Sequence, residues 1–356
     1  MRSPDVVIVG GGVVGLAIAV EAGRRGLTVD LFDAGRTGAA SRAAAGLIAP
    51  TLGTAPPGVT ALFLAAAREY PDFLDWLAEI GAPRVPIGWG VLEVAASADR
   101  LHALQAGNPE ARVLNARSLR EIEPALTTAA GAVMHAADAW LDPGSLVDAL
   151  ASATERMDCV RRSSAAIRAI DVLPQEIALR TEDGTVQHAP LVVVAAGAWS
   201  AHIGGLPTAL PVTPARGQLV LIQGPHQLTR AVAFDDGYIV PRGDGVIVGS
   251  TMEHVGFDPT TTPAALRGLE ESARAVIPGT VAAARSRRGW AGLRPVTPDM
   301  LPIIDRDPRS QRLIYACGHS KNGVLLAPST ARAVVALLTG ERPTIDMAPF
   351  SVGRFS

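Results

Sequence analysis

The amino-terminal part of the chain has an apolar run, a cluster of glycines and a second apolar run in succession. Residues 5–9 are rich in β-branched side chains, residues 10–15 read G-G-G-V-V-G, and residues 16–25 have a helical composition that stops at Gly26. A short β-branched run favours a strand, and a longer run closed by glycine favours a helix. The pattern therefore predicts a strand, a tight turn and a helix.

Gly10, Gly12 and Gly15 have the spacing of a dinucleotide-binding turn. Glycines at these positions allow a tight turn, a close backbone approach to a pyrophosphate and close packing of the helix on the strand. The positive amino end of the helix then attracts the anion. A second predicted strand, residues 27–32, ends at Asp33, whose carboxylate is placed to accept hydrogen bonds from an adenosine ribose. A purely structural glycine turn is the alternative, and the motif does not separate FAD from NAD.

Short strands and helical stretches alternate along the rest of the chain. Asp183-Gly184 marks a hairpin within residues 167–188, and residues 191–195 form a continuous apolar run that predicts a buried strand. Residues 264–275 predict a helix. Further short strands are predicted at residues 88–95, 131–135, 218–223, 238–240 and 245–250. This alternation predicts an α/β (α+β) fold.

Composition excludes several classes of protein. The 356 residues have 19% charged side chains, a formal charge of −2 and a mean hydropathy of +0.25, which favours a compact protein without a basic face for nucleic acid. Cys159 and Cys317 lack the spacing of a disulfide framework or a zinc site, so no metal is expected. The apolar start lacks the basic segment and cleavage site of a signal peptide, and no run is long enough to span a membrane. We expect a cytoplasmic protein.

Six blocks in the sequence carry a family resemblance. They are VIVGGGVVGLAIA, SRAAAGLIAP, VVVAAGAWS, YIVPRGDGVIVGSTM, WAGLRPVTPDMLPIID and GHSKNGVLLAP, and they extend from Val7 to Pro328. With them the chain resembles the glycine oxidase and D-amino-acid oxidase family of FAD enzymes. It is most similar to the glycine oxidases that supply thiamine biosynthesis, although sarcosine oxidases share the general plan. The resemblance implies noncovalent FAD.

The resemblance also implies two interleaved domains. A Rossmann-like FAD-binding domain is expected over residues 1–84, 141–217 and 295–356. A substrate domain built on an antiparallel sheet is expected over residues 85–140 and 218–294.

Small residues dominate the positions that the resemblance assigns to FAD. A backbone lying against the isoalloxazine ring leaves no volume for side chains, which explains the alanines; a flexible Ala-rich loop is the alternative. Together with the three glycines of the turn, the expected contacts are Val13, Val14, Asp33, Ala34, Ala40, Ser41, Arg42, Ala45, Gly46, Leu47 and Ala166.

Three residues match the substrate positions of the family. Arg294 matches the residue that holds the substrate carboxylate, which a guanidinium fork binds through two parallel charge-assisted hydrogen bonds. Tyr238 matches a tyrosine whose hydroxyl helps to hold that carboxylate, and Met252 matches the pocket wall. The alternatives are an interdomain salt bridge for Arg294, a solvent-facing sheet tyrosine for Tyr238 and a core position for Met252.

A glycine-rich segment precedes the last predicted helix, residues 324–338, which ends at Gly340. The amino end of this helix is expected to face the flavin and to stabilise the negative charge that builds there on reduction. The candidates for this cradle are Gly318, His319, Ser320, Lys321, Asn322, Gly323 and Val324. The family role of His319 is structural.

Lys321 is the only lysine of the chain, and all other basic residues except the histidines are arginine. It lies where the family usually has an arginine that contacts substrate. Lysine keeps the charge but removes the planar fork, so we expect Ser320 and Lys321 to widen the site for a substrate other than glycine, or larger. Neutral drift is the alternative.

These patterns predict an FAD-dependent oxidase of a small amino acid, which moves a hydride from Cα to flavin N5 and uses molecular oxygen to yield an imino acid and hydrogen peroxide. Three alternatives remain: a dehydrogenase that passes electrons to a quinone or carrier protein, an oxidase of 2-hydroxy acids, and a nucleotide-binding regulator without turnover. Oligomeric state stays open, because glycine oxidases are typically tetramers and relatives include monomers.

Overall fold

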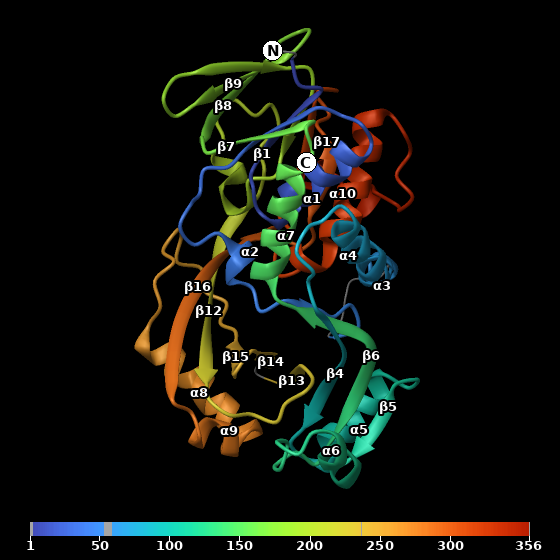
Figure 1. Ribbon diagram of the computed structural model, residues 1–356, viewed down its shortest axis with the longest axis vertical. Coiled ribbons are helices and arrows are strands. Elements are labelled where there is room, and N and C mark those ends of the chain that lie inside the picture. The colour runs from blue at the N-terminus through green and yellow to red at the C-terminus, as the bar shows by residue number, and fades with distance from the viewer. Residues whose placement is uncertain (1–2, 53–58, 236, 356) are drawn as a thin grey trace.

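Residues 3–52, 59–235 and 237–355 are described by a computed structural model, in which two large sheets lie one above the other (Figure 1). The upper sheet contains the predicted nucleotide-binding strands. Its strand order is β17 (Ile303–Arg306), β18 (Leu313–Cys317), β11 (Val192–Val194), β1 (Val6–Val9), β2 (Val29–Phe32) and β7 (Val160–Ser163). All neighbours in it are parallel except β17 and β18.

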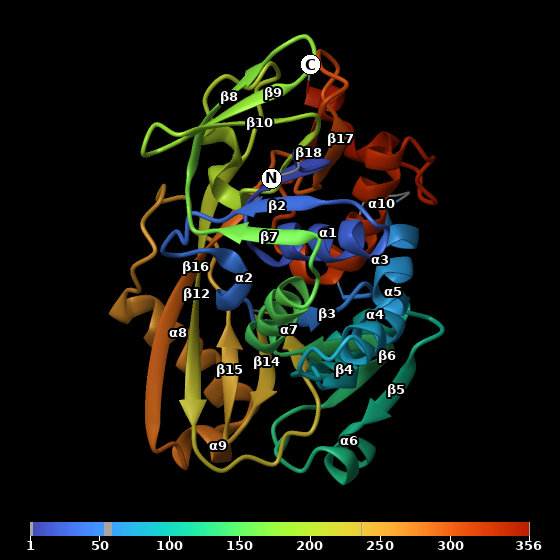
Figure 2. The same cartoon turned by 45° about the horizontal axis from the view of Figure 1, so that its top comes forward.

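The upper sheet is buried on both faces, which explains why its strands are apolar without alternation. Val6 and Ile8 pack on one side against the helices, whereas Val7 and Val9 pack on the other side against a small antiparallel sheet. Figure 2 shows this sheet and the helices on opposite faces. The helices are α1 (Val13–Arg24), α3 (Thr60–Arg68), α4 (Tyr70–Glu79), α7 (Pro143–Glu155) and α10 (Gly323–Thr339), and the small sheet is β8 (Ile167–Val172), β9 (Ile177–Thr181) and β10 (Val186–Ala189).

The lower sheet lies beneath the first and is mainly antiparallel. Its strand order is β16 (Ser286–Val296), β12 (Thr213–Gln223), β15 (Gly245–Gly249), β14 (Gly237–Arg242), β13 (Val232–Phe234), β4 (Ile87–Ala95), β6 (Gly131–Leu141) and β3 (Leu47–Ile48), with β5 (Arg112–Asn115) beside β6. The predicted strands and the helix at residues 264–275 are thus confirmed, with longer bounds for β6 and β12.

Two helices pack on one face of the lower sheet. Leu269 and Ala273 of α8 (Pro263–Val276) and Val281 of α9 (Pro278–Ala282) pack with Val220 and Val248. The opposite face turns toward the upper sheet. Three further α-helices are α2 (Ala40–Ala43), α5 (Ala98–Gly107) and α6 (Ala116–Ile122), and the 3₁₀ helices are η1 (Gly197–His202), η2 (Ala348–Phe350) and η3 (Val352–Phe355).

The expected domain boundaries at 217/218 and 294/295 fall inside β12 and β16, two long strands that pair along their whole length. These strands run from the upper half of the molecule into the lower half (Figure 1). Hydrophobic periodicity indicates which face of a strand is buried, but it does not mark where one continuous strand passes between domains. The division into two domains stays a prediction.

A buried tyrosine supports the helix that begins at the site. Pro328 lies inside α10 and has no N–H, so the carbonyl of Val324, four residues earlier, lacks its helical donor. The hydroxyl of Tyr70 donates a hydrogen bond to that carbonyl instead. Burial raises the pKa of Tyr70 above its ordinary value, so the hydroxyl keeps its proton.

Tyr70→Phe is expected to lower the free energy of unfolding by about 1–3 kcal/mol, because the Val324 carbonyl is then buried without a donor. Urea denaturation at a fixed FAD concentration measures the loss. Tyr238→Phe removes a hydroxyl that donates to no described residue and serves as the matched control. Equal unfolding midpoints for the two variants would contradict this account of α10.

Candidate active site

A cleft of about 1020 Å³ lies between the two sheets and brings together most of the predicted residues. The predicted residues that line it are Gly10, Gly12, Val13, Val14, Asp33, Ala34, Ala40, Ser41, Ala45, Gly46, Leu47, Ala166, Tyr238, Met252, Arg294, His319, Ser320, Lys321, Asn322, Gly323 and Val324. Gly15, Arg42 and Gly318 are outside this lining.

The glycine turn at the amino end of α1 has no room for side chains. Gly10 has φ +117°, and a Cβ on it would lie 2.3 Å from the carbonyl oxygen of Ala195. A Cβ on Gly15 would lie 1.8 Å from the carbonyl oxygen of Gly10, so Gly15 serves the packing of α1 on β1 rather than the cleft. The N–H of Val13 donates to the Ser41 hydroxyl, at 2.9 Å. The turn therefore fits a close backbone approach to a pyrophosphate.

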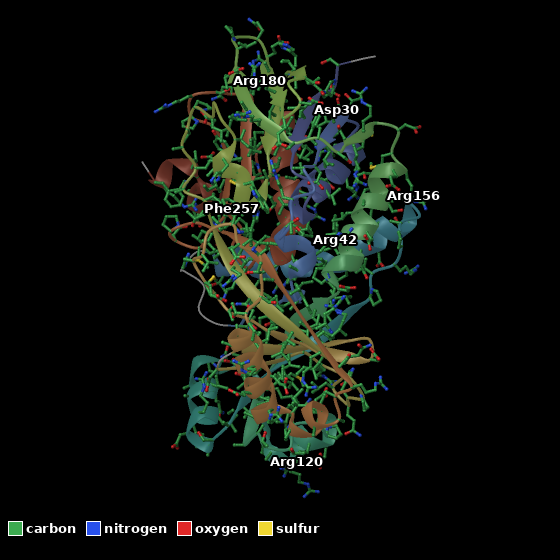
Figure 3. The ribbon with its side chains drawn as sticks, turned by 90° about the vertical axis from the view of Figure 1, so that its left-hand side faces the viewer. Asp30, Arg42, Arg120, Arg156, Arg180 and Phe257 are labelled. Carbon is green, nitrogen blue, oxygen red and sulfur yellow. The ribbon has the colours of Figure 1, made fainter. Side chains whose placement is uncertain are left out.

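Arg42 is turned away from the cleft. Its guanidinium pairs with Asp148 of α7 at 2.6 Å, and both side chains are exposed. Successive residues of a helix point about 100° apart, so Ser41 and Arg42 of the short α2 face different surroundings. Figure 3 labels Arg42 beside this helix. The prediction of Arg42 among the cofactor contacts is not supported by its position.

Arg294 extends along the cleft face of β16 and lies flat across Gly217 of β12. Its Nη1 donates to the Thr251 carbonyl at 2.8 Å and its Nη2 to the Ser250 hydroxyl at 2.7 Å. A Cβ on Gly217 would lie only 2.1 Å from Nη1. Among the described residues no carboxylate pairs with this guanidinium, so the salt-bridge alternative finds no support. The fork keeps its positive charge and faces the cleft.

Tyr238 and Met252 flank this guanidinium differently. The ring of Tyr238 lies over Gly249, where a Cβ would be 2.6 Å from the hydroxyl oxygen. Both Tyr238 and Gly249 are in one row across β14 and β15. Met252 is 44% exposed, with its sulfur 4.0 Å from Nη1 of Arg294, which places it at the rim of the cleft and not in the core.

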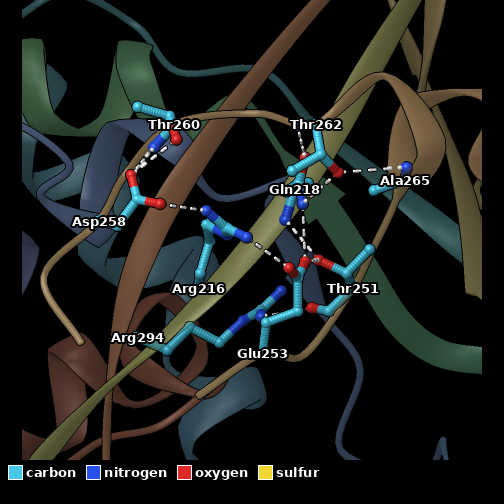
Figure 4. A network of polar contacts seen from close by, with 9 residues as sticks. All are labelled: Arg216, Gln218, Thr251, Glu253, Asp258, Thr260, Thr262, Ala265 and Arg294. Carbon is cyan, nitrogen blue, oxygen red and sulfur yellow. Dashed lines mark hydrogen bonds and ion pairs between the residues drawn. The ribbon is translucent and has the colours of Figure 1, made fainter. Parts of the chain in front are cut away.

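A polar network built around the buried side chains of Arg216 and Gln218 holds the segment that receives Arg294 (Figure 4). Arg216 pairs with Glu253 at 2.6 Å and with Asp258 at 2.7 Å, and Gln218 donates to Glu253 at 2.7 Å and to Thr251 through its backbone N–H at 3.0 Å. Burial alone would raise the pKa of Glu253, but hydrogen bonds from Thr251, Arg216 and Gln218 lower it below its ordinary value. The network thus fixes the Thr251 carbonyl.

The amino end of α10 lines the cleft opposite the glycine turn, as predicted for the cradle. His319 is fully buried beside it, and burial lowers the pKa of this imidazole to about 3, so it is neutral. One of its nitrogens hydrogen-bonds the Thr330 hydroxyl at 3.1 Å. A Cβ on Gly318 would lie 2.6 Å from the Thr297 methyl, so Gly318 is a packing glycine. Lys321 is exposed and borders the cleft.

Several residues in or beside the cleft were not predicted from the sequence. Gly217 and Gly249 make room for Arg294 and Tyr238, and Ser250 and Thr251 bind the guanidinium. Glu93 of β4 also lines the cleft. The contacts of these residues with Arg294 and Tyr238 follow only from how the strands pair, because the contacting residues are far apart in sequence.

The cleft fits FAD on three counts. The amino ends of two helices, α1 and α10, line it, and the positive end of each helix dipole favours an anion or developing negative charge. Asp33 lies at the end of β2, where a ribose hydroxyl is expected. Burial raises the pKa of the Cys317 thiol to about 12, so this cleft residue stays protonated and is a poor nucleophile for covalent attachment.

The described residues lack two features. No group of three or more His, Cys, Asp or Glu side chains there is arranged to hold a metal ion. No helix in the same ranges is long and apolar enough to cross a membrane.

Comparison with known proteins identifies the family. The model of the family DAO, described as FAD dependent oxidoreductase, matches residues 5–337. Glycine oxidase of Pseudomonas putida is 33% identical over 365 residues, which cover 98% of this chain and 98% of that protein. The hydrogen cyanide synthase subunit HcnC of Pseudomonas aeruginosa is 29% identical and covers 99% of this chain and 97% of its own length.

A solved structure agrees with these sequence relatives. Glycine oxidase from Geobacillus kaustophilus superposes with a TM-score of 0.91 at 29% identity, over 99% of both chains. The expected fold class and cofactor are thereby confirmed. The chain belongs to the DAO family of FAD-dependent oxidoreductases.

Proposed function

We propose that this protein oxidises the Cα–N bond of a small amino acid or a related amine. The observation that carries the proposal is Arg294, a guanidinium without a carboxylate partner among the described residues, facing the cleft that also contains the dinucleotide turn. FAD held in this cleft would supply a two-electron acceptor for the hydride that leaves Cα and would be reoxidised by molecular oxygen, so that the products would be an imino acid and hydrogen peroxide.

The residues of the chain position the substrate. The Arg294 fork binds the carboxylate through two charge-assisted hydrogen bonds, and the Tyr238 hydroxyl adds a third. Orientation of this kind can contribute about 7–11 kcal/mol to lowering the barrier. His319 is a poor candidate for an acid or base, because burial lowers its pKa to about 3 and its ring is already hydrogen-bonded to Thr330.

Anaerobic bleaching of the bound flavin tests the proposal. Small amino acids, N-methyl amines and 2-hydroxy acids are mixed separately with the FAD-loaded protein without oxygen. We expect bleaching with amino acids or amines, release of ammonia or a primary amine, and peroxide once air is admitted. Bleaching only with 2-hydroxy acids, or reoxidation only by a quinone, would favour the alternative reactions.

Lys321→Arg is expected to lower kcat/KM for an amino acid larger than glycine about tenfold relative to glycine, because the longer planar fork narrows the cleft. Steady-state peroxide formation with the two substrates measures the ratio. Arg309→Lys, an exposed residue that donates to the Pro207 carbonyl, is a control for the exchange of basic residues. An unchanged ratio would favour neutral drift at Lys321.

A further inference from the structure

A carboxylate lies on the same sheet face as the proposed substrate residues. Glu93 of β4 pairs with Ala233 of β13, and Ala233 pairs with Tyr238 of β14. Aligned residues of neighbouring strands point to the same face, and all three line the cleft. With strands about 4.8 Å apart, the Cα atoms of Glu93 and Tyr238 are separated by about 10 Å.

The space between Glu93 and Tyr238 is open. The residue between them is alanine, the small side chain of Ala233. The Tyr238 ring leans in the other direction, over Gly249. A ligand whose carboxylate is held by Arg294 and Tyr238 would reach Glu93 by extending past the Tyr238 ring and across Ala233.

Glu93 is held rigidly from behind by a buried hydrogen-bond chain. A ring nitrogen of His135 lies 3.0 Å from Glu93 Oε2, and the other lies 2.6 Å from the Thr51 hydroxyl. That hydroxyl lies 2.9 Å from Asp138, and Asp138 is fully buried.

Each hydrogen bond in this series needs one donor and one acceptor. Glu93 accepts a hydrogen bond from His135 in two arrangements of the protons. If Asp138 is ionised, Thr51 donates to it, His135 donates to Thr51, and a cationic His135 also donates to Glu93. If Asp138 is protonated, Thr51 donates to a neutral His135, which again donates to Glu93. Burial raises the pKa of Asp138 above its ordinary value, and in both arrangements the His135 ring donates to Glu93.

One oxygen of Glu93 is left for a ligand. Arg100 forms a long ion pair with Oε1 at 3.9 Å, which is beyond hydrogen-bond distance, and its shorter contacts, at 2.6 and 2.7 Å, are with Asp235. A carboxylate in a partly buried cleft with a free oxygen is a favourable partner for an ammonium group.

We propose that Glu93 forms a second substrate subsite, which binds a cationic group at the far end of a substrate whose carboxylate is held by Arg294. The preferred substrate class is then an amino acid with a second, distal amine. This inference rests on the proposed function and assigns the substrate class of the same cleft. Lys321 is the competing feature, since it would instead favour a substrate with a second carboxylate.

Binding of ligands that lack an α-amine tests the subsite without turnover. The FAD-loaded protein is titrated with γ-aminobutyrate and ε-aminocaproate, with their ω-hydroxy counterparts, and with glutarate, and dissociation constants are taken from the perturbation of the flavin absorption spectrum. We expect at least one amine to bind about tenfold more tightly than its hydroxy counterpart. Glu93→Gln keeps the hydrogen bond to His135 and is expected to abolish this preference.

A second variant tests the subsite independently, in case Glu93→Gln does not fold. Ala233→Leu fills the path, so it should weaken the longer amines while acetate, which does not reach Ala233, binds as before. Equal binding of amines and hydroxy acids, or tightest binding of glutarate, would overturn the subsite. If even acetate fails to perturb the flavin spectrum, the carboxylate site at Arg294 and with it the proposed function fail instead.

Discussion

Arg294→Ala is expected to lower kcat/KM for the amino acid substrate by about 10³-fold or more. The variant removes both charge-assisted hydrogen bonds to the carboxylate, and with them the orientation of Cα. The lost orientation should appear in kcat as well as in KM, since a substrate held by fewer contacts reaches the reactive pose less often. Stopped-flow reduction of the flavin under anaerobic conditions measures the effect on the half-reaction.

The control for this variant is Arg285→Ala. Arg285 is an exposed arginine that pairs with Asp244 near the start of β16, outside the residues that line the cleft. It should retain the rate of the unmodified protein. FAD content should be equal in all three proteins, because Arg294 makes its described contacts with residues 250–252 and not with the glycine turn. A loss of less than tenfold for Arg294→Ala would mean that another group holds the carboxylate.

Gly217→Ala is the second substitution with a large expected effect, although glycine 217 has no side chain to contribute. The added methyl would lie 2.1 Å from Nη1 and 2.3 Å from Cζ of Arg294, so the guanidinium must move off the strand. Displacements of about 1 Å can cost about 10²-fold in rate, and we expect a loss of that size in kcat/KM. The same anaerobic reduction measures it.

A double-mutant cycle shows whether the loss acts through Arg294. In the Arg294→Ala background the added methyl meets no guanidinium, so Gly217→Ala should cause little further loss. Gly268→Ala on α8 is the matched control, because no atom lies within 4 Å of its Cβ position. Additive losses in the cycle would show that Gly217 affects the reaction by another route.

The nucleotide-binding half of the fold was predictable because its signals are local. The strand at residues 5–9, the glycine turn and the helix after it follow one another within about 20 residues, and β1 and α1 have nearly these bounds. The last helix was equally predictable from its apolar face and the glycine at its end; α10 ends at Thr339, and Gly340 has φ +74°. In both cases the amino end of the helix lines the cleft.

Positions that depend on strand pairing were not predictable from local pattern. Gly217 and Gly249 are invisible as functional residues until register places them beneath Arg294 and Tyr238. Glu93 likewise reads as an ordinary polar residue of a half-buried strand. Its place in the cleft depends on the pairing of β4 with β13, more than 130 residues later in the chain.

The direction in which each side chain of a short helix points could not be predicted from the sequence either. Ser41 and Arg42 are the polar residues of one small-residue stretch, and both were expected to contact FAD. The serine hydroxyl accepts from the start of α1, whereas the arginine pairs with Asp148 on the outer surface. A four-residue helix has too few positions for an amphipathic pattern to show which side faces the cofactor.

The most direct test of the account is a crystal structure of the FAD-loaded protein with acetate, a carboxylate that cannot be oxidised at an amine-bearing carbon. We predict that both acetate oxygens lie within hydrogen-bond distance of the Arg294 guanidinium, that one also lies near the Tyr238 hydroxyl, and that the methyl carbon faces the flavin ring. Acetate bound at Lys321 with Arg294 still bonded only to Ser250 and Thr251 would contradict the account.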